Sequence, residues 1–593
     1  MMIESLAFKL IAASALCIAV LLPFYYLLGY SVLSFVSSVW HYRSKHSWEF
    51  TFEDVPIAAL ALLSSIVVGC KVAGVFPQIE LIWQLSTIAF IICLSLSLCL
   101  AKIGRIKPQL PLPSWKPSLI WVILFVIYLG RSLIKARSLE SAQYLPSRFN
   151  TDIFLYIRRS IVFLSQAERS HTENGDRLLD ILYNSPKLLS TLVYTTFTKI
   201  SGDIGIAASI VTSIVLAAIV LKYLLLLGKY SSGITWVNCG LAGLIIFQPV
   251  WCWLQDQFYW SNLLCIYLLV YLLQNLVDSS SIERTWLIRY TLALIALAGF
   301  YPSQIPFFCL ATGIGISFQA DLAAKTRHRY LIASLGIAIA ILCLFSTQYF
   351  DTSEVVKHFD LTDAKHGQNL NYIPFWAWWY FEPRTGGTPK DLGAVLLIAG
   401  SLLLAAIAIR YCWQTLPRRS NWFKLLLILY LLYSLSYLLL PGEYRQSKFF
   451  FTYIVPLIVF CAIEWVGQTR LKRQRIFRLL VPALAVYVAI KSFDKPYKPH
   501  VAGEISQVIA NLKPNQPLTI YTDDGSIAHG YYYFAYRLRH QDFELFTGCP
   551  ASEDLQSLDR RRQAIVAKSC PQIEIPADLE DKIIYPNING ADE

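Results

Sequence analysis

The stretch from Arg148 to Lys187 is polar and rich in charge, lies between long hydrophobic segments, and carries the first candidate for chemistry. Asp152 opens a run with the spacing of an amphipathic helix, and one face of that run consists of Ile153, Tyr156, Ile157 and Ser160. Asp152, or Thr151 beside it, could simply cap the helix, because both residue types accept hydrogen bonds from free backbone amides. The alternative is that the carboxylate takes part in chemistry on an anionic, lipid-linked substrate. Cations that could hold such a substrate are Arg148, Arg158 and Arg159.

Two further segments place polar residues at the ends of hydrophobic runs. Asp256 lies in WCWLQDQFYW, where it is either a secondary carboxylate of the site, with or without a divalent cation, or an ordinary interfacial carboxylate among aromatic residues. Tyr301, Ser303 and Gln304 lie in GFYPSQIPF, whose prolines and polar residues predict a tight turn. A structural role is the simpler interpretation of that turn, and substrate contact is the alternative.

The remaining candidates come later in the chain. The insert 346–390 contains His358 and the aromatic residues Trp376 and Trp379, which are either an interfacial belt or an apolar platform for a prenyl chain or a sugar face. Arg445 and Lys448 precede a late hydrophobic run in GEYRQSKFFFTYIVP. Guanidinium and ammonium groups suit phosphate, although cations at helix ends also commonly extend toward the membrane interface. No Gly-rich phosphate loop, HExxH, paired-Cys zinc pattern or nucleophile elbow occurs in the sequence.

The elements that position these residues must be membrane helices. Of the 593 residues, 55% are hydrophobic and only 15% are charged, and repeated apolar runs approach the roughly 20 residues needed to cross the bilayer as helix. A β-barrel would show short alternating segments instead. The net charge of +12 does not indicate nucleic acid, because the basic residues lie largely in short loops, as the positive-inside rule predicts. We therefore expect an all-α polytopic membrane protein with about 13 to 14 transmembrane helices.

One orientation agrees with the basic loops. The loop 101–117 is basic and therefore predicted to be cytoplasmic, and the next span, from Ser118 to about Gly130, leads to the outer face. The inserts 131–187 and 346–390, with amphipathic helices, are then outer loops. Before these spans, Phe8 to Trp40 could be one long span or a short re-entrant pair. The predicted parts are an N-terminal transmembrane extension (1–117), a transmembrane module (118–491) and an extracytoplasmic tail (492–593).

The tail has the composition of a small α/β module that rests on the membrane part. EISQVIANL predicts a helix and PLTIYTDD predicts a strand that ends in a turn. Cys549 and Cys570 lie in this polar region, and an extracytoplasmic location would allow them to form one disulfide.

The layout of the outer loops resembles a known family. An acidic residue just ahead of an amphipathic helix (NTDIFLYIRRSIVFL), then a Pro before another hydrophobic stretch (NSPKLLSTLVYTTFTKISG), is similar to the first outer loop of the C-type (GT-C) superfamily of polyprenyl-phosphate-sugar-dependent membrane glycosyltransferases. YRQSKFFFTYIVPLIVF resembles the late-span pattern of a cation, aromatic residues and Pro in that superfamily. The resemblance covers about Ser118 to Ile490 and implies that Asp152 is the catalytic acidic residue and Arg445 or Lys448 a phosphate-contacting cation. Several spans precede the acidic loop here, whereas many members place that loop after the first span.

The expected function is an inverting sugar transfer from a polyprenyl-phosphate donor to a lipid, glycan or protein acceptor, with Asp152 as general base. The expected location is the bacterial plasma membrane, among membrane lipids, with the site on the periplasmic or outer face. One alternative is a glycan polymerase or ligase that uses a diphosphate-linked lipid. The other is a lipid or solute transporter, which would place charged sites near the middle of the membrane.

Overall fold

The computed structural model describes a set of helices and a few strands, to which every structural statement below refers. The described residues are 2–44, 50–75, 78–104, 114–136, 153, 156–157, 160, 163, 188–230, 235–277, 284–318, 323–349, 421–439, 449–468, 475–493, 497, 518–522, 543–547, 550–551, 563–566 and 583–584.

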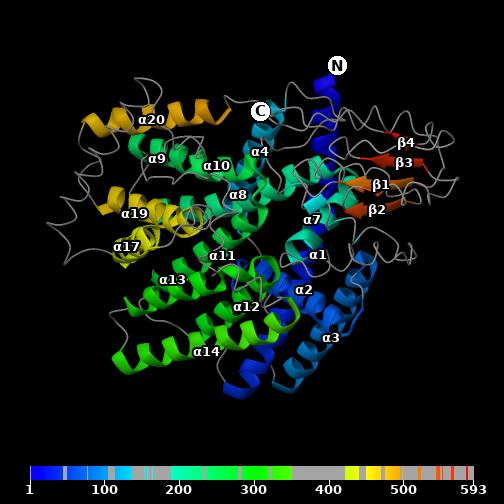
Figure 1. Cartoon of the computed structure of the whole chain (residues 1–593). Coiled ribbons are helices and arrows are strands. Elements are labelled where there is room, and N and C mark those ends of the chain that lie inside the picture. Colours follow the sequence, from blue (N-terminus) through cyan, green and yellow to red (C-terminus); the bar gives the residue numbers. More distant parts are fainter. Residues whose placement is uncertain are drawn as a thin grey trace.

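Helices make up almost all of the described chain (Figure 1). Those of the first half are α1 (Met2–Ser44), α2 (Asp54–Val72), α3 (Ile79–Gly104), α4 (Trp115–Lys135), α7 (Leu188–Ser201), α8 (Ile204–Tyr230), α9 (Trp236–Ile246), α10 (Pro249–Asp256), α11 (Trp260–Val277) and α12 (Arg284–Phe300). Those of the second half are the 3₁₀ helix η2 (Pro302–Gln304), α13 (Ile305–Ser317), α14 (Ala324–Tyr349), α17 (Asn421–Leu439), the π-helix η6 (Phe450–Ile454), α19 (Val455–Gln468) and α20 (Arg475–Phe493).

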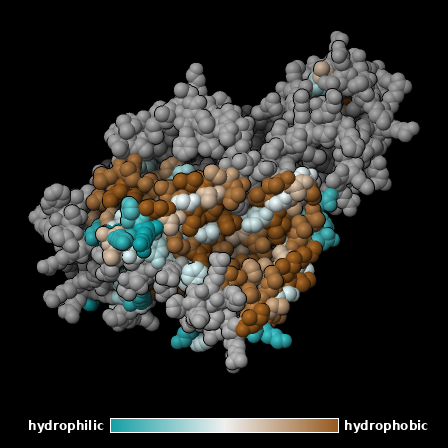
Figure 2. Space-filling model, turned by 90° about the horizontal axis from the view of Figure 1, so that it is seen from below, coloured by the Kyte–Doolittle hydropathy of each residue, from teal (hydrophilic) through white to brown (hydrophobic). Residues whose placement is uncertain are grey.

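The surface of the bundle is apolar where lipid would lie. Six helical segments are long and apolar enough to cross a membrane, and six shorter apolar helices of 10–17 residues accompany them. Figure 2 shows a broad hydrophobic face with hydrophilic groups near its margins, and α3 and α14 both expose large aliphatic side chains, such as Ile91 and Ile339. A soluble protein rarely exposes so much contiguous apolar surface. The prediction of an all-α polytopic membrane protein is confirmed, while the total number of spans stays a prediction.

The N-terminal helices belong to the same hydrophobic core as the rest. α1 is one continuous helix of 43 residues with Pro23 inside it, so it has no break for a re-entrant pair and is long enough for the single span. α2 and α3 pack against α1, and α2 also packs against α12. The core cluster of buried apolar side chains runs without a break from α1 to α19. The N-terminal extension is therefore integrated into the bundle.

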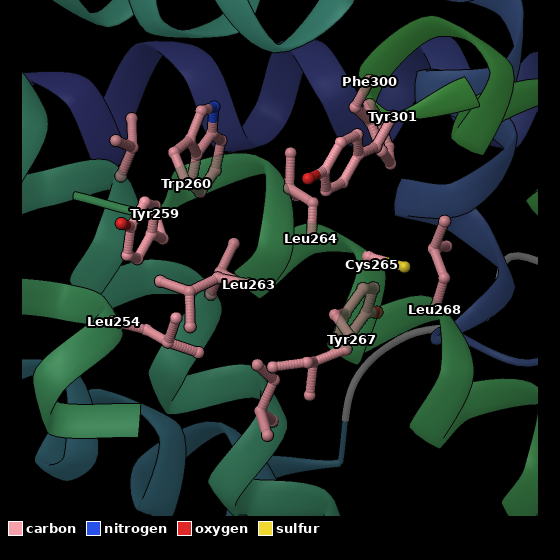
Figure 3. Close-up of a cluster of buried hydrophobic side chains, with 14 of the residues drawn as sticks. Leu254, Tyr259, Trp260, Leu263, Leu264, Cys265, Tyr267, Leu268, Phe300 and Tyr301 are labelled. Carbon is pink, nitrogen blue, oxygen red and sulfur yellow. The ribbon is translucent and has the colours of Figure 1, made fainter. Parts of the chain in front are cut away.

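α11 lies at the centre of this core. It packs against α8, α12, α13 and η6, and nearly all of its side chains are buried. Figure 3 shows its residues together with the turn that precedes it, and Tyr301 at the end of α12 points toward Leu264. Because α11 contacts so many helices, polar groups at its two ends can be positioned by helices from several parts of the chain.

Two helices approach so closely that glycine is required between them. A Cβ added to Gly240 of α9 would lie 2.7 Å from the backbone nitrogen of Pro482 in α20, closer than real Cβ contacts. Figure 1 shows these two helices next to each other. Small residues at helix crossings are a common way to bring membrane helices together.

The tail contains a parallel sheet with the strand order β2-β1-β3-β4. The strands are β1 (Leu518–Thr522), β2 (Phe543–Thr547), β3 (Gln563–Val566) and β4 (Ile583–Ile584). In the register, Ile520 pairs with Leu545 on one side and with Ile565 on the other. The strand predicted in PLTIYTDD is confirmed, and the predicted EISQVIANL helix lies outside the described residues.

Candidate functional site

The turn between α10 and α11 is the hub of the site. Pro249 occupies the first turn of α10, where its missing N–H costs nothing, and the Gln248 side chain accepts a hydrogen bond from the Trp251 N–H at 2.8 Å. α10 ends in a Schellman motif, in which the N–H of Tyr259 bonds to the carbonyl of Leu254 at 2.9 Å. Phe258 takes the left-handed position of that motif with φ 54°, where glycine is usual. The side chain of Phe258 must therefore compensate for a backbone cost of roughly 1–2 kcal/mol.

A buried group of charged and polar side chains surrounds the last residue of α10, and we call it the Asp256 cluster. Its members are Arg131, Lys135, Gln255, Asp256 and Tyr497. Arg131 binds the Asp256 carboxylate through both guanidinium nitrogens, Nη1 to Oδ1 at 2.8 Å and Nη2 to Oδ2 at 2.6 Å. The Lys135 ammonium donates to Oδ2 at 2.6 Å, and the Tyr497 hydroxyl donates to Oδ1 at 3.2 Å. Both carboxylate oxygens therefore accept two hydrogen bonds each.

The cluster is held in place by helix geometry. Arg131 and Lys135 are four residues apart in α4, so they lie on the same face one turn apart. Asp256 is the last residue of α10, where the partial negative charge of the helix end disfavours a carboxylate. Two cations at hydrogen-bonding distance offset that repulsion and the cost of removing the carboxylate from water.

Further hydrogen bonds join the cluster to three segments of the chain. Arg131 donates from Nε to the carbonyl of Ser492 at 3.1 Å and from Nη1 to Gln255 at 2.8 Å. The Tyr497 N–H donates to the carbonyl of Lys135 at 2.8 Å, which satisfies a carbonyl at the C-terminal end of α4. The end of α4, the end of α10 and the start of the tail are thus linked. This contact agrees with a tail that rests on the membrane part.

The prediction for the end of this span was wrong in one respect. The sequence places residues from 131 onward in an outer loop, whereas α4 continues to Lys135 and buries both cations. Charged residues after an apolar run are typical of a loop, so Arg131 and Lys135 were not identified as site residues. Their spacing of four in RSLIK, with an apolar pair between, was the signal available.

Asp256 was predicted as a secondary carboxylate or a metal contact. Because all its acceptor positions are taken by Arg131, Lys135 and Tyr497, the geometry favours a charge-pairing and positioning role. Among the described residues, no group of three or more His, Cys, Asp or Glu side chains is arranged to hold a metal ion. Binding of a divalent cation at Asp256 therefore stays a prediction.

The amphipathic face predicted after Asp152 is confirmed. Ile153, Tyr156, Ile157 and Ser160 are helical and fully or almost fully buried. The ring of Tyr156 packs edge-on against Phe258 with centroids 5.4 Å apart, and its hydroxyl bonds to Ser261 at the start of α11. This face therefore lies against the α10–α11 turn, and its packing explains why a bulky residue is kept at position 258.

The π-helix η6 lies against α10 and α11, on either side of the turn. The ring of Phe451 is 5.0 Å from that of Trp253 in α10, and Asn262 in α11 donates to the hydroxyl of Thr452 at 3.4 Å. Short π-helices occur frequently at functional sites because they shift side chains out of the regular helical register. η6 begins two residues after Lys448 in the sequence.

The turn predicted around residues 301–304 is confirmed as η2. Tyr301 is buried against α11, and the Gln304 carbonyl accepts a hydrogen bond from the Tyr453 hydroxyl of η6 at 3.1 Å. The Gln304 side-chain oxygen is buried without a hydrogen-bond partner in the described part of the chain. The structure thus brings Asp256, Tyr301 and Gln304 to helices that contact the same end of α11.

The other predicted residues lie outside the described ranges. They are Arg148, Asp152, Arg158, Arg159, His358, Trp376, Trp379, Arg445 and Lys448, together with Cys549 and Cys570 of the predicted disulfide. Residues on the C-terminal side of Asp152 and of Lys448 are described: the first contact the α10–α11 turn at Phe258, and the second contact α10 and α11 on either side of it.

A second charged group, which we call the Asp54 cluster, lies toward the other end of α11, with Asp54 and Lys222 buried and Glu53 partly exposed. Asp54 pairs with Arg289 of α12 through Oδ1 at 2.9 Å and Oδ2 at 3.1 Å, and it accepts a hydrogen bond from the Tyr271 hydroxyl of α11. Glu53 pairs with Lys222 of α8 at 2.5 Å. The printed pairs of this cluster thus join two carboxylates to two cations. This cluster was not predicted from the sequence.

Comparison of the chain with family models, with curated proteins and with solved structures finds no match.

Proposed function

We propose that this protein is a membrane glycosyltransferase that moves a sugar from a polyprenyl-phosphate donor to a lipid, glycan or protein acceptor. The observation that carries the proposal is the convergence on the α10–α11 turn. The helix face just after Asp152 packs on this turn through Tyr156, and the π-helix that follows Lys448 packs on Trp253 of α10, just before the turn, through Phe451. Described residues that follow Asp152 and Lys448 in the sequence thus contact α10 and the turn after it, which supports the proposal.

The proposed reaction requires only groups of these types. The acceptor hydroxyl attacks the anomeric carbon of the donor and passes its proton to the Asp152 carboxylate, which acts as general base. The bond between the anomeric carbon and the phosphate oxygen breaks, and its electron pair leaves with the polyprenyl phosphate. Arg445 and Lys448 stabilise the negative charge on that leaving group. Because attack and departure occur on opposite sides, the configuration of the anomeric carbon is inverted.

Other predicted residues receive supporting roles in this proposal. Trp376 and Trp379 bind the prenyl chain or a sugar face, while Arg148, Arg158, Arg159 and His358 line the polar side of the site. Tyr301 and Gln304 contact the substrates from the turn after α12, and the Gln304 side-chain oxygen, which has no hydrogen-bond partner among the described residues, is consistent with such a contact. The membrane is proposed to be a bacterial plasma membrane with the site and an α/β tail domain on its outer face.

The direct test measures sugar transfer in membranes that contain the native lipid donor and acceptor. Asp152→Asn should lower the rate by about 10²–10⁴-fold, the usual contribution of a positioned general base. Asp176→Asn is the matched control, because it changes a carboxylate of the same polar stretch and should leave the rate near that of the wild type. Full transfer by Asp152→Asn would rule out the proposed role, and transfer that depends on the arginines but not on Asp152 would favour a diphosphate-dependent polymerase or ligase.

A further inference from the structure

The charge balance of the Asp256 cluster is unusual for a buried site. Arg131 is 0% exposed, Lys135 is 4% exposed and Asp256 is 6% exposed. In the described part of the chain, Asp256 is the one carboxylate that contacts either cation, so two positive charges face one negative charge. A buried charge without a counter-charge is expensive, because neither water nor a partner replaces its hydration.

The hydrogen bonds of the cluster show the same imbalance. Asp256 has no acceptor position left, since four donors already use its two oxygens. Lys135 has three N–H donors, and one of them reaches an acceptor among the described residues, the Asp256 carboxylate. The ring of Tyr497 lies 5.5 Å from the ammonium nitrogen, which adds a cation–π contact but no acceptor oxygen. Counted over the described residues, the cluster therefore has donors and positive charge in excess.

The Asp54 cluster provides an internal comparison. Lys222 is buried as deeply as Lys135, and it too lies over a tyrosine ring, 5.2 Å from that of Tyr271. Lys222 has a carboxylate partner of its own in Glu53, and Arg289 pairs separately with Asp54. In the Asp256 cluster, by contrast, Arg131 and Lys135 share one carboxylate among the described residues.

We propose that Arg131 and Lys135 form a binding site for an anionic phosphate oxygen, closed by Tyr497 at the start of the tail. The ligand supplies the missing negative charge and accepts the unused N–H donors of Lys135, and Asp256 positions the two cations. Phosphate is the chemistry that fits a guanidinium and an ammonium side by side. Its source is a lipid-linked phosphate or free phosphate. This proposal rests on the proposed function in one respect, because that function makes a polyprenyl-phosphate donor the expected lipid.

The test uses the full-length chain in phosphatidylcholine nanodiscs and counts bound ligand by native mass spectrometry. Three probes are titrated separately: polyprenyl monophosphate, phosphatidylglycerol and inorganic phosphate. Lys135→Gln should weaken binding about tenfold or more, because a charge-assisted hydrogen bond is worth roughly 1.5–3 kcal/mol. Lys135→Arg should restore most of the affinity, and Lys222→Gln should bind as the wild type does.

The probes identify the source of the phosphate. Lys135-dependent binding of polyprenyl monophosphate alone assigns the site to the lipid-linked donor, and the same dependence for phosphatidylglycerol or inorganic phosphate assigns it to a headgroup or to free phosphate. Equal binding by the wild type and Lys135→Gln for all three probes, or an equal loss in Lys222→Gln, would overturn the proposal. Binding is measured without turnover, so loss of transfer in Asp152→Asn and loss of binding in Lys135→Gln report on separate claims.

Discussion

At the residue scale, the molecule shows two ways of placing costly groups in an apolar bundle. Among the described residues, each cation of the Asp54 cluster has its own carboxylate, whereas the two cations of the Asp256 cluster share one. Phe258 carries a backbone cost and compensates for it by packing against Tyr156 and Tyr194. None of these features follows from sequence spacing alone, because they depend on which distant residues meet.

The excess of positive charge in the Asp256 cluster predicts that two substitutions lower the free energy of unfolding by different amounts. Asp256→Asn leaves two buried cations without a counter-charge and should lower the free energy of unfolding by about 3–5 kcal/mol. Lys135→Met leaves the balanced pair of Arg131 and Asp256 and should cost less than about 1.5 kcal/mol. Denaturant unfolding of both variants in the same detergent, without added phosphate, compares them. A larger loss for Lys135→Met would contradict the charge count.

The left-handed backbone of Phe258 predicts an unusual order of stability for two variants with smaller residues. Phe258→Ala loses the aromatic packing and keeps most of the left-handed strain, whereas Phe258→Gly loses the packing but relieves the strain. Phe258→Gly should therefore be the more stable variant by about 1 kcal/mol, although glycine is normally the more destabilising residue. Thermal unfolding of both variants in one detergent measures this order, and a more stable alanine variant would show that φ at this position is not constrained.

At the element scale, the sequence predicts which helices, strands and turns exist better than it predicts where they end. The amphipathic face after Asp152, the turn at residues 301–304 and the strand in PLTIYTDD were predicted from periodicity and turn residues, and all three are confirmed. The end of α4 was missed, because a cation after an apolar run has the same local pattern whether it enters water or pairs with Asp256 on another helix. η6 was not predicted either, since a π-helix depends on packing rather than on a sequence period.

The crossing of α9 and α20 predicts a position-dependent effect of adding one methyl group. Gly240→Ala places a Cβ against the backbone of Pro482 and should cost about 1–3 kcal/mol of unfolding free energy. Gly228→Ala in α8 is the matched control, because a Cβ there meets nothing within 4 Å and alanine favours helix. Unfolding of the two variants side by side should therefore shift in opposite directions, and similar shifts would mean that α9 and α20 are not in close contact.

At the scale of the whole molecule, composition predicts the membrane class, and the apolar surface of the bundle agrees with it. The orientation rests on the distribution of basic loops and stays a prediction. What composition could not show is how helices from both halves of the chain meet around α11. That arrangement is set by packing between segments hundreds of residues apart, as in the contact of Tyr223 in α8 with the carbonyl of Pro456 in α19.

The orientation predicts the redox state of the tail. If the tail lies on the outer face, Cys549 and Cys570 should be oxidised to one disulfide, which would close a loop worth on the order of 3 kcal/mol in the chain-entropy model. Alkylation of native membranes before and after reduction, followed by mass spectrometry of the tail peptides, distinguishes the two states. Free thiols at both positions before reduction would argue for a cytoplasmic tail.

The most direct test of the central claim is a structure of the full chain with a stable analogue of a polyprenyl-phosphate sugar. An attacking oxygen lies about 3–3.5 Å from the carbon it attacks, and a general base lies about 2.6–3.2 Å from that oxygen. The Asp152 carboxylate should therefore be found within about 7 Å of the anomeric carbon, beside the α10–α11 turn. A sugar bound beyond about 10 Å from Asp152, or bound at the Asp54 end of α11, would contradict the account.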